Sequence, residues 1–431
     1  MYHDPEHECM DRGRLEQLQL ERLQSTLNRV ARNVPFYRRK FEELDIDPDG
    51  FLSLEDVRKL PFTTKADLRD NYPYGMFAVP LREVVRLHAS SGTTGKAVVV
   101  GYSKNDIKKW AGLAARVLTA GGVTKDDVVQ IAFGYGMFTG GFGFHYGAEL
   151  LGASVVPSSS GNTRRQIQIL QDYKTTALLC TPSYALYLAG VMEEMEVNIN
   201  ALALKYGLFG AETWSEAMRL KIQEKLKITA TDNYGLSEIM GPGVAGECME
   251  RAGLHINEDH FLAEIIDPDT LKPVPHGETG ELVLTTLTKE AFPMIRFRTG
   301  DLTRLITEPC ACGRTLHRMD RVLGRSDDMF ILRGVNVFPS QVGAILSKIK
   351  GIEPCYQIIL TREGALDTAV VLVEAGGESF DEIKNLQAMT ETVKKELESG
   401  LGVSFEVRLV ERKSLYKDGS KTGLVVDKRK F

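Results

Sequence analysis

The feature that most restricts the possible folds is an alternation that extends from about residue 84 to residue 290. Short apolar runs are separated there by longer stretches with apolar residues at helical spacing, and the runs are Val84–Leu87, Val128–Phe133, Ser154–Val156, Ala177–Cys180 and Tyr206–Phe209. Strands that alternate with helices form βαβ units, because a parallel pair of strands needs a long crossover. The sequence therefore predicts an α/β fold with mostly parallel sheets.

The segments on either side of this alternation have different patterns. Residues 11–33 have the spacing of an amphipathic helix that Pro35 stops, and further helix starts are expected at Ser53 and within residues 61–68. Glu264–Ile266 and Gly280–Thr286 are strand-like, with proline and glycine turns between them, and predict an antiparallel β subdomain.

Residues 324–328 are a polar break, after which a smaller α+β unit is expected. We expect this unit to contain strands at 330–332, 356–360, 369–373 and 404–409, and helices at 342–348 and 391–398. We therefore expect an N-terminal domain over residues 1–326 and a C-terminal domain over residues 327–431.

Composition excludes several classes of protein. The chain has 431 residues and a net charge of -5, so no basic surplus indicates nucleic-acid binding. The polar start has neither the charge nor the apolar run of a signal peptide, and no apolar stretch reaches the length of a membrane helix. Six cysteines in a chain of this length are too few for a disulfide scaffold. A cytoplasmic enzyme is the expected class.

A glycine- and hydroxyl-rich loop follows the first apolar run. Glycines allow a close approach of the backbone to a ligand, and the hydroxyls and the ammonium group add donors suited to phosphate. The loop consists of Ser90, Ser91, Gly92, Thr93, Thr94, Gly95 and Lys96. It fails the Walker A pattern, because Ser90 replaces the first glycine and Ala97 replaces the final Ser or Thr. A plain Ser/Gly-rich hairpin turn is the alternative.

Further motifs accompany this loop in a fixed order. Tyr234-Gly235-Leu236-Ser237-Glu238, Thr299-Gly300-Asp301, Gly324-Arg325-Ser326-Asp327-Asp328 and Gly419-Ser420-Lys421-Thr422-Gly423 follow it along the chain. Together they resemble the motifs of the adenylate-forming superfamily of acyl-CoA synthetases, luciferases and peptide-synthetase adenylation domains. Segments 133–141, 145–149 and 333–340 narrow the resemblance to the phenylacetate–CoA ligase family, over roughly residues 30 to 431.

The resemblance implies a two-step reaction with ATP and coenzyme A as substrates. A carboxylate attacks the α-phosphate of ATP and releases pyrophosphate, and the coenzyme A thiolate then attacks the acyl carbon and releases AMP. Lys421 is implied as the catalytic lysine of the first step, Glu238 as a ligand of Mg²⁺, and Asp327 as the hinge of a mobile C-terminal domain. A solvated lysine, a glutamate at a helix start and a plain linker are the alternatives.

The same resemblance implies the residues that bind the nucleotide and coenzyme A. Tyr234 would stack on adenine and Asp301 would accept hydrogen bonds from the ribose hydroxyls. The remaining implied residues are Gly210, Ala211, Glu212, Asn233, Gly235, Ser237 and Arg325 for the nucleotide, and Gly334 near coenzyme A. The alternatives are a core aromatic for Tyr234, an ordinary turn for Asp301 and for residues 210–212, and a surface residue for Arg325.

An aromatic acyl pocket is the third implied site. Its residues are Tyr135, Phe138, Gly140, His145 and Tyr146, and aromatic walls with small glycines between them suit a flat aryl group. Core packing is the alternative. The expected substrate is phenylacetate or a close aryl-acetic analogue, and the family implies a homodimer.

Cys248, His255, Cys310 and Cys312 suggest a structural metal site. Three thiolates and one imidazole make the closed tetrahedral set that structural Zn²⁺ prefers, although the C-x-C spacing is less usual than C-x₂-C. Free cysteines with an unrelated histidine are the alternative.

Other functions remain open at this stage. The acyl group could pass to the pantetheine of a carrier protein, or the chain could be a nucleotide-binding regulatory protein without catalysis. A zinc-knuckle nucleic-acid binder is disfavoured by the net charge of -5.

Overall fold

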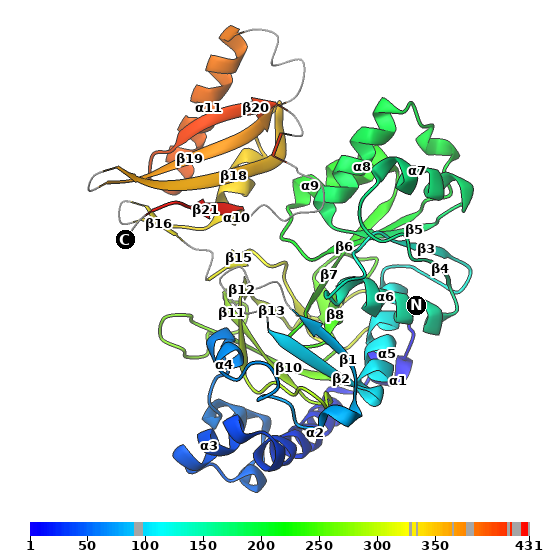
Figure 1. Ribbon diagram of the computed structural model, residues 1–431, viewed down its shortest axis with the longest axis vertical. Helices are drawn as coiled ribbons and strands as arrows, with labels where there is room; N and C mark the ends of the chain where they lie inside the picture. Colours follow the sequence, from blue (N-terminus) through cyan, green and yellow to red (C-terminus); the bar gives the residue numbers. More distant parts are fainter. Residues whose placement is uncertain are drawn as a thin grey trace. The chain divides into compact units, whose positions relative to one another are not determined.

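The computed structural model describes residues 1–89, 98–326, 330–332, 335–363, 366–375, 383–411, 414–415 and 424–429. The chain forms two compact units (Figure 1). The first contains residues 1–181, 191–211 and 226–321, and the second contains residues 182–190, 212–225 and 322–431.

Helices form the N-terminal part of the first unit. The predicted helix over residues 11–33 is confirmed as α2 (Arg12–Asn33), which Asp11 caps by accepting hydrogen bonds from the N–H groups of Gly13 and Arg14. The segment after Ser53 forms a 3₁₀ helix rather than an α-helix. The other elements here are α1 (Pro5–Glu8), α3 (Pro35–Glu43), η1 (Pro48–Gly50), η2 (Leu54–Lys59), α4 (Lys65–Asp70) and η3 (Leu81–Glu83).

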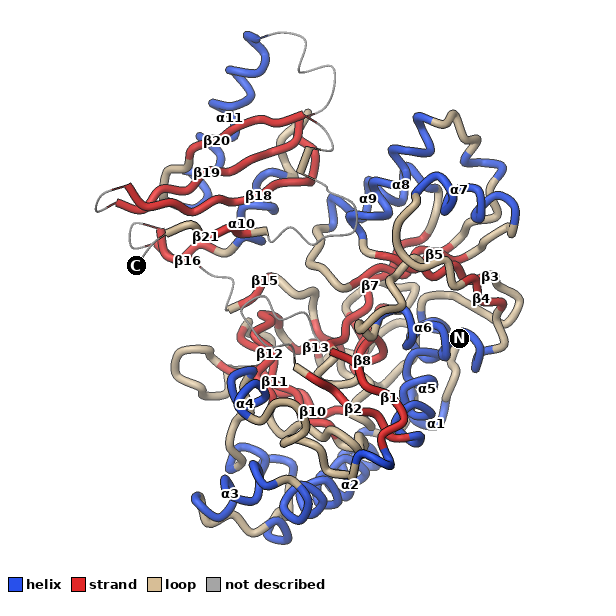
Figure 2. The backbone as a smooth tube through the Cα atoms, viewed as in Figure 1, coloured by secondary structure: helices blue, strands red, loops and turns tan. Residues whose placement is uncertain are grey.

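The main sheet of the first unit combines a parallel and an antiparallel half. Figure 2 shows its strands in red. Its order is β13-β14-β9-β8-β7-β6-β5-β3-β4. The strands are β3 (Val128–Ile131), β4 (Ser154–Val156), β5 (Ala177–Cys180), β6 (Tyr206–Gly210), β7 (Thr229–Leu236), β8 (Gly241–Glu247), β9 (Leu254–Ile256), β13 (Leu305–Ile306) and β14 (Arg318–Met319).

The pairing of neighbouring strands changes from parallel to antiparallel at one place in this sheet. From β4 to β7 the neighbouring strands are parallel, as the alternation predicts. Strands β7 and β8 are antiparallel, because only residues 237–240 connect them and a parallel crossover needs about a dozen residues or more. The antiparallel half was not expected from the sequence.

The first apolar run does not join this sheet. It forms β1 (Val84–Ala89), which pairs antiparallel with β2 (Val99–Ser103) in a separate two-stranded sheet. The expectation that this run contributes to the parallel sheet is therefore wrong. The segment between the two strands is too short for the crossover that a parallel neighbour would need.

Two helices pack closely against each other and against the main sheet. They are α5 (Lys104–Ala120) and α6 (Gly140–Leu151), and α6 also packs against β3, β4 and β8. A Cβ atom at Gly147 would lie 2.6 Å from the Cβ of Ala114, and one at Gly143 would lie 2.6 Å from the ring of Trp110. The glycines therefore allow the contact of α6 with α5.

The predicted antiparallel subdomain is confirmed. Strands β10 (Phe261–Ile266), β11 (Gly280–Thr286) and β12 (Phe297–Thr303) pair in sequence order. The remaining helices between residues 160 and 230 are α7 (Thr163–Asp172), α8 (Pro182–Glu194), η4 (Ile199–Ala201) and α9 (Glu216–Leu226).

The C-terminal part of the second unit is the expected α+β arrangement. Its sheet has the order β20-β19-β18-β21, and α10 and α11 pack together. Val371, Val393 and Leu397 belong to its buried core. The elements are β15 (Gly324–Arg325), β16 (Phe330–Leu332), β17 (Val335–Val337), α10 (Pro339–Leu346), β18 (Ile352–Glu363), β19 (Leu366–Ala375), α11 (Ile383–Leu401), β20 (Glu406–Glu411) and β21 (Val425–Asp427).

Within the residues that the structure describes, none of the helices combines the length and the apolar character required to cross a membrane.

Candidate active site and metal centre

The expected nucleotide residues of the first unit lie where β6 and β7 end side by side. Gly210 pairs with Asn233, and the Nδ2 atom of Asn233 donates a hydrogen bond of 2.5 Å to the carbonyl oxygen of Phe209. A Cβ atom at Gly210 would lie 2.4 Å from the carbonyl oxygen of Asn233, so only glycine fits. Ala211 has a φ of 68°, a left-handed conformation that is uncommon for alanine and that often marks a functional loop.

The residues expected to bind adenine and ribose contact each other directly. The hydroxyl of Tyr234 donates to Oδ2 of Asp301 at 2.5 Å, which joins the end of β7 to β12. Asp301 is 8% exposed, and its N–H donates to the hydroxyl of Thr299 at 3.0 Å. The structure thus brings together a flat ring and a fixed carboxylate, the two groups that a nucleoside needs.

A tight turn between β7 and β8 carries Ser237 and Glu238. A Cβ atom at Gly235 would lie 1.9 Å from the carbonyl oxygen of Gly241, so only glycine allows the chain to close here. The hydroxyl of Ser237 lies 3.2 Å from that of Thr139, and Glu238 is 6% exposed. The carboxylate of the expected magnesium ligand is therefore held on a short, enclosed segment.

Three buried side chains donate hydrogen bonds to carbonyl oxygens of residues 239–242, and sequence reasoning missed all three. Lys289 Nζ donates to Ile239 at 2.6 Å, the Tyr102 hydroxyl to Met240 at 3.2 Å, and Trp110 Nε1 to Pro242 at 2.7 Å. We call these three the carbonyl-binding residues. No pattern in the sequence identifies them, because lysine is normally exposed and buried aromatic residues are common.

Burial changes the ionisation of two of the carbonyl-binding residues. Burial lowers the pKa of Lys289 to about 7, against the opposing charges of Asp106 and Glu238. Burial and the same two carboxylates raise the pKa of Tyr102 well above its ordinary value. The carboxylates of Asp106 and Glu238 are therefore close enough to influence both groups.

The residues expected to line the acyl pocket form an aromatic cluster on α6 and the loop before it. Tyr135 and Phe142 meet edge to face at 5.2 Å, and the Tyr135 hydroxyl lies 3.2 Å from Nδ1 of His145. Arg86 lies 4.8 Å from the ring of Tyr146 and donates a hydrogen bond of 2.8 Å to its hydroxyl. Phe142 and Arg86 were not anticipated.

Phe138 and Gly140, which were also expected to line the acyl pocket, do not belong to this aromatic cluster. Phe138 is 53% exposed, so in this structure it is not part of a closed wall. Gly140 is the first residue of α6. The cluster therefore supplies aromatic surface from Tyr135, Phe142 and Tyr146, with the Nε2 atom of His145 directed to Glu149 at 3.1 Å.

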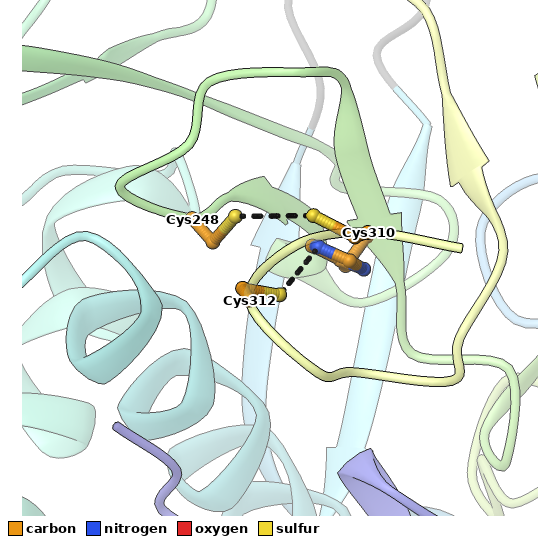
Figure 3. Close-up of side chains that lie close together, drawn as sticks. Cys248, Cys310 and Cys312 are labelled. Carbon is orange, nitrogen blue, oxygen red and sulfur yellow. Dashed lines mark hydrogen bonds between the residues drawn. The ribbon is translucent and has the colours of Figure 1, made fainter. Parts of the chain in front are cut away.

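The cysteine and histidine residues converge on one point (Figure 3). Their ligand atoms all lie within 4.8 Å of one another. Cys248 Sγ and Cys310 Sγ are 3.8 Å apart, and Cys312 Sγ is 3.4 Å from His255 Nε2. A tetrahedral zinc with ordinary bond lengths would separate two sulfurs by about 3.8 Å and sulfur from nitrogen by about 3.5 Å. The donor set and its spacing therefore fit a structural zinc ion.

The surroundings of the four residues also suit a metal. His255 Nδ1 lies 3.3 Å from the carbonyl oxygen of Leu316, which orients Nε2 toward the sulfurs. Burial and the neighbouring sulfurs raise the pKa of Cys248. Burial alone would also raise the pKa of Cys312, but hydrogen bonds from His255 and the backbone of Arg314 lower it. A bound cation would stabilise the thiolate forms of these cysteines.

The other expected site residues belong to the second unit or lie outside the described part of the chain. Glu212 Oε1 accepts the N–H of Ser183 at 2.6 Å within the second unit, and Arg325 lies in β15. Residues outside the described part of the chain are Ser90, Ser91, Gly92, Thr93, Thr94, Gly95, Lys96, Asp327, Gly334 and Lys421.

The fold is that of an enzyme of the adenylate-forming class. Residues 55–287 match the family model described as AMP-binding enzyme, and residues 334–429 match the AMP-binding enzyme C-terminal domain. The phenylacetate-coenzyme A ligase of Thermus thermophilus is 48% identical over 445 residues, with 100% of both chains covered.

Solved structures of a CoA ligase have a similar fold. The 2-hydroxyisobutyryl-CoA ligase in its postadenylation state has a TM-score of 0.91 at 30% identity, covering 98% of this chain and 91% of that chain. The same enzyme with coenzyme A in its thioesterification state has a TM-score of 0.73 at 31% identity, covering 99% and 92%. The chain belongs to the phenylacetate–coenzyme A ligase family of AMP-binding enzymes.

Proposed function

We propose that this enzyme ligates phenylacetate or a close aryl-acetic analogue to coenzyme A through an acyl-adenylate, with release of AMP and pyrophosphate. The observation that carries the proposal is the contact of Tyr234 with Asp301 at 2.5 Å, in the same compact unit as the aromatic cluster of Tyr135, Phe142 and Tyr146. A nucleoside site and an aromatic surface are what an aryl-adenylate requires. The full-length likeness to a phenylacetate-coenzyme A ligase supports the choice of acid.

The first half-reaction needs positioning and charge stabilisation more than acid–base catalysis. Tyr234 would stack on adenine and Asp301 would accept the ribose hydroxyls, which fixes the α-phosphate in line with the attacking carboxylate. Glu238 would hold Mg²⁺, which neutralises phosphate charge when bound. Residues 90–96 would bind the β- and γ-phosphates, and Lys421 would approach the carboxylate and α-phosphate oxygens.

The second half-reaction would use another face of the C-terminal domain. Asp327 would act as the hinge, and the region of Gly334 would meet coenzyme A. The 2-hydroxyisobutyryl-CoA ligase is solved in postadenylation and thioesterification states, which supports a two-state cycle for this chain.

A structural zinc ion would be held by Cys248, His255, Cys310 and Cys312. The four ligand atoms within 4.8 Å of one another support this assignment. The set is closed, so the metal would have no open position for chemistry and would serve to join the segment after β8 to residues 310–312.

A panel of aryl acids tests the function most directly. Purified protein is incubated with ATP, Mg²⁺ and either phenylacetate, a hydroxyphenylacetate, indole-acetate or 2-hydroxyisobutyrate, with and without coenzyme A. We expect acid-dependent pyrophosphate release, and coenzyme A thioester with the aryl acids but not with 2-hydroxyisobutyrate. Pyrophosphate release without coenzyme A consumption would point to the carrier-protein alternative, and no acid-dependent pyrophosphate release would contradict the ligase assignment.

The family also suggests a homodimer in the cytoplasm. Sedimentation of the purified protein tests the dimer, for which a mass near twice the 47.9 kDa of one chain is expected.

A further inference from the structure

Lys289 is a buried amine that the reaction scheme above does not use. Its side chain is 1% exposed, and in the described part of the chain no carboxylate forms an ion pair with it. Lysine is almost never buried without a partner, since removal of an ammonium group from water is energetically costly. The burial of Lys289 therefore needs a physical explanation.

The contacts of the Lys289 ammonium group point to the turn after β7. Nζ donates to the carbonyl oxygen of Ile239 at 2.6 Å, and Ile239 directly follows Glu238. The ring centroids of Tyr102 and Phe292 lie 4.5 and 5.3 Å from Nζ. Aromatic faces partly replace the lost hydration of a cation, so the charge is accommodated beside the turn.

The backbone next to Lys289 is itself fixed. Asp106 is 0% exposed and accepts hydrogen bonds from the N–H groups of Glu290 at 2.7 Å and Ala291 at 3.0 Å. The same carboxylate accepts the N–H of Ser103 at 2.9 Å in the capping box that starts α5. The base of the lysine side chain is thus anchored to α5, and its tip reaches the turn.

The geometry points to Lys289 as a positioning residue for the adenylation half-reaction, because it holds the turn that presents the Glu238 carboxylate to the metal-bound nucleotide. This inference rests on the proposed function, in which Glu238 is a magnesium ligand. Mg²⁺ requires near-octahedral geometry, so a small displacement of one carboxylate weakens its binding. Without the lysine, the carbonyl of Ile239 would be buried without its donor, and the turn would shift to satisfy it.

The test compares Lys289→Met with Lys109→Met. Lys109 Nζ donates to the carbonyl oxygen of Thr288 at 2.8 Å, so the control removes a lysine of α5 that contacts the segment next to Lys289 but not the turn. We expect Lys289→Met to raise the Mg²⁺ concentration for half-maximal pyrophosphate release about tenfold, as loss of a buried charged hydrogen bond implies. Thioester formation from supplied phenylacetyl-adenylate should stay close to wild type in both variants.

Further variants separate the possible failures. Lys289→Gln keeps a shorter donor, should show an intermediate shift, and replaces the methionine variant if that protein does not fold. In an otherwise wild-type chain, Glu238→Gln should itself raise the Mg²⁺ concentration needed for pyrophosphate release. If wild type releases pyrophosphate and Glu238→Gln has the same Mg²⁺ requirement, the magnesium assignment in the proposed function fails. The positioning role of Lys289 is overturned by either of two results. In the first, Glu238→Gln raises the Mg²⁺ requirement but the Lys289 variants behave like Lys109→Met. In the second, the Lys289 variants lose both half-reactions equally.

Discussion

The hydrogen bond from Tyr234 to Asp301 connects residues that are 67 positions apart in the chain. Both were predicted as nucleotide-binding residues because their short motifs resemble those of a known family. Their direct contact could not be predicted, because it depends on the end of β7 meeting β12, a strand from a different sheet. At the residue scale, the motif identifies the chemical group and the fold decides what surrounds it.

The Tyr234 hydroxyl can be tested without loss of its ring. Tyr234→Phe should raise the KM for ATP roughly threefold to tenfold, because Asp301 loses a partner that orients its carboxylate. The kcat should change little, since the ring that would contact adenine remains. Steady-state kinetics measure both values, with Tyr173→Phe, whose side chain is 60% exposed, as the control. An unchanged KM in Tyr234→Phe, and also in Asp301→Asn, would contradict the ribose assignment.

The buried carboxylate of Glu258 should make the free energy of unfolding depend on pH. Burial alone would raise the pKa of Glu258, but His317 and Arg12 lower it, and Arg12 Nη1 lies 2.8 Å from Oε2. A lowered folded pKa contributes stability above the ordinary glutamate value of 4.5, which is lost as pH falls through the folded pKa. Arg12→Met should therefore lower the free energy of unfolding by about 1–3 kcal/mol at neutral pH and by less at acid pH.

Urea unfolding between pH 7 and pH 3 measures this difference. Arg14→Met is the control, because Arg14 is exposed on the same helix. Parallel stability curves for Arg12→Met and wild type across the whole range would show that the ion pair does not set the pKa of Glu258.

At the element scale, the cysteine-containing segment 310–312 organises the N-terminus as well as the metal ligands. The hydroxyl of Tyr2 donates to the carbonyl oxygen of Cys312 at 2.6 Å, and Arg314 Nε donates to Glu8 at 2.6 Å. The sequence spacing suggested the four ligands, but it gave no indication that residues 1–10 pack on this segment. Such contacts join residues about 310 positions apart, beyond the reach of any local pattern.

Removal of one zinc ligand should therefore affect the N-terminus. Cys312→Ser is expected to lower the zinc content from about one per chain to near zero and the Tm by about 5 °C or more. Proteolysis within the first ten residues should become faster, because the segment that anchors them loses its metal. Elemental analysis, calorimetry and limited proteolysis are the measurements, and Cys9→Ser, which alters none of the four ligands, is the control. Zinc-free wild-type protein with an unchanged Tm would contradict the metal assignment.

At the scale of the whole molecule, the two half-reactions are assigned to different faces of the C-terminal domain. Lys421→Ala should lower acid-dependent pyrophosphate release at least about 100-fold, because a charge that stabilises the transition state is lost. Thioester formation from supplied acyl-adenylate should stay within about threefold of wild type. Lys428→Ala, an exposed lysine just after β21, is the control. Equal loss of both half-reactions would contradict this two-face assignment.

The sequence by itself determined the strand and helix alternation, the antiparallel subdomain, the C-terminal α+β unit and the family motifs. These features depend on local spacing and on short segments with special residues, which a linear sequence displays directly. Only the tertiary structure decided that β1 leaves the main sheet, that β8 reverses direction, and that Lys289, Tyr102 and Trp110 hold the turn beside Glu238. The physical reason is that the role of a buried donor depends on the acceptor that it contacts. For these three side chains the acceptor lies about 50 to more than 130 residues away in the chain, so no local pattern reveals it.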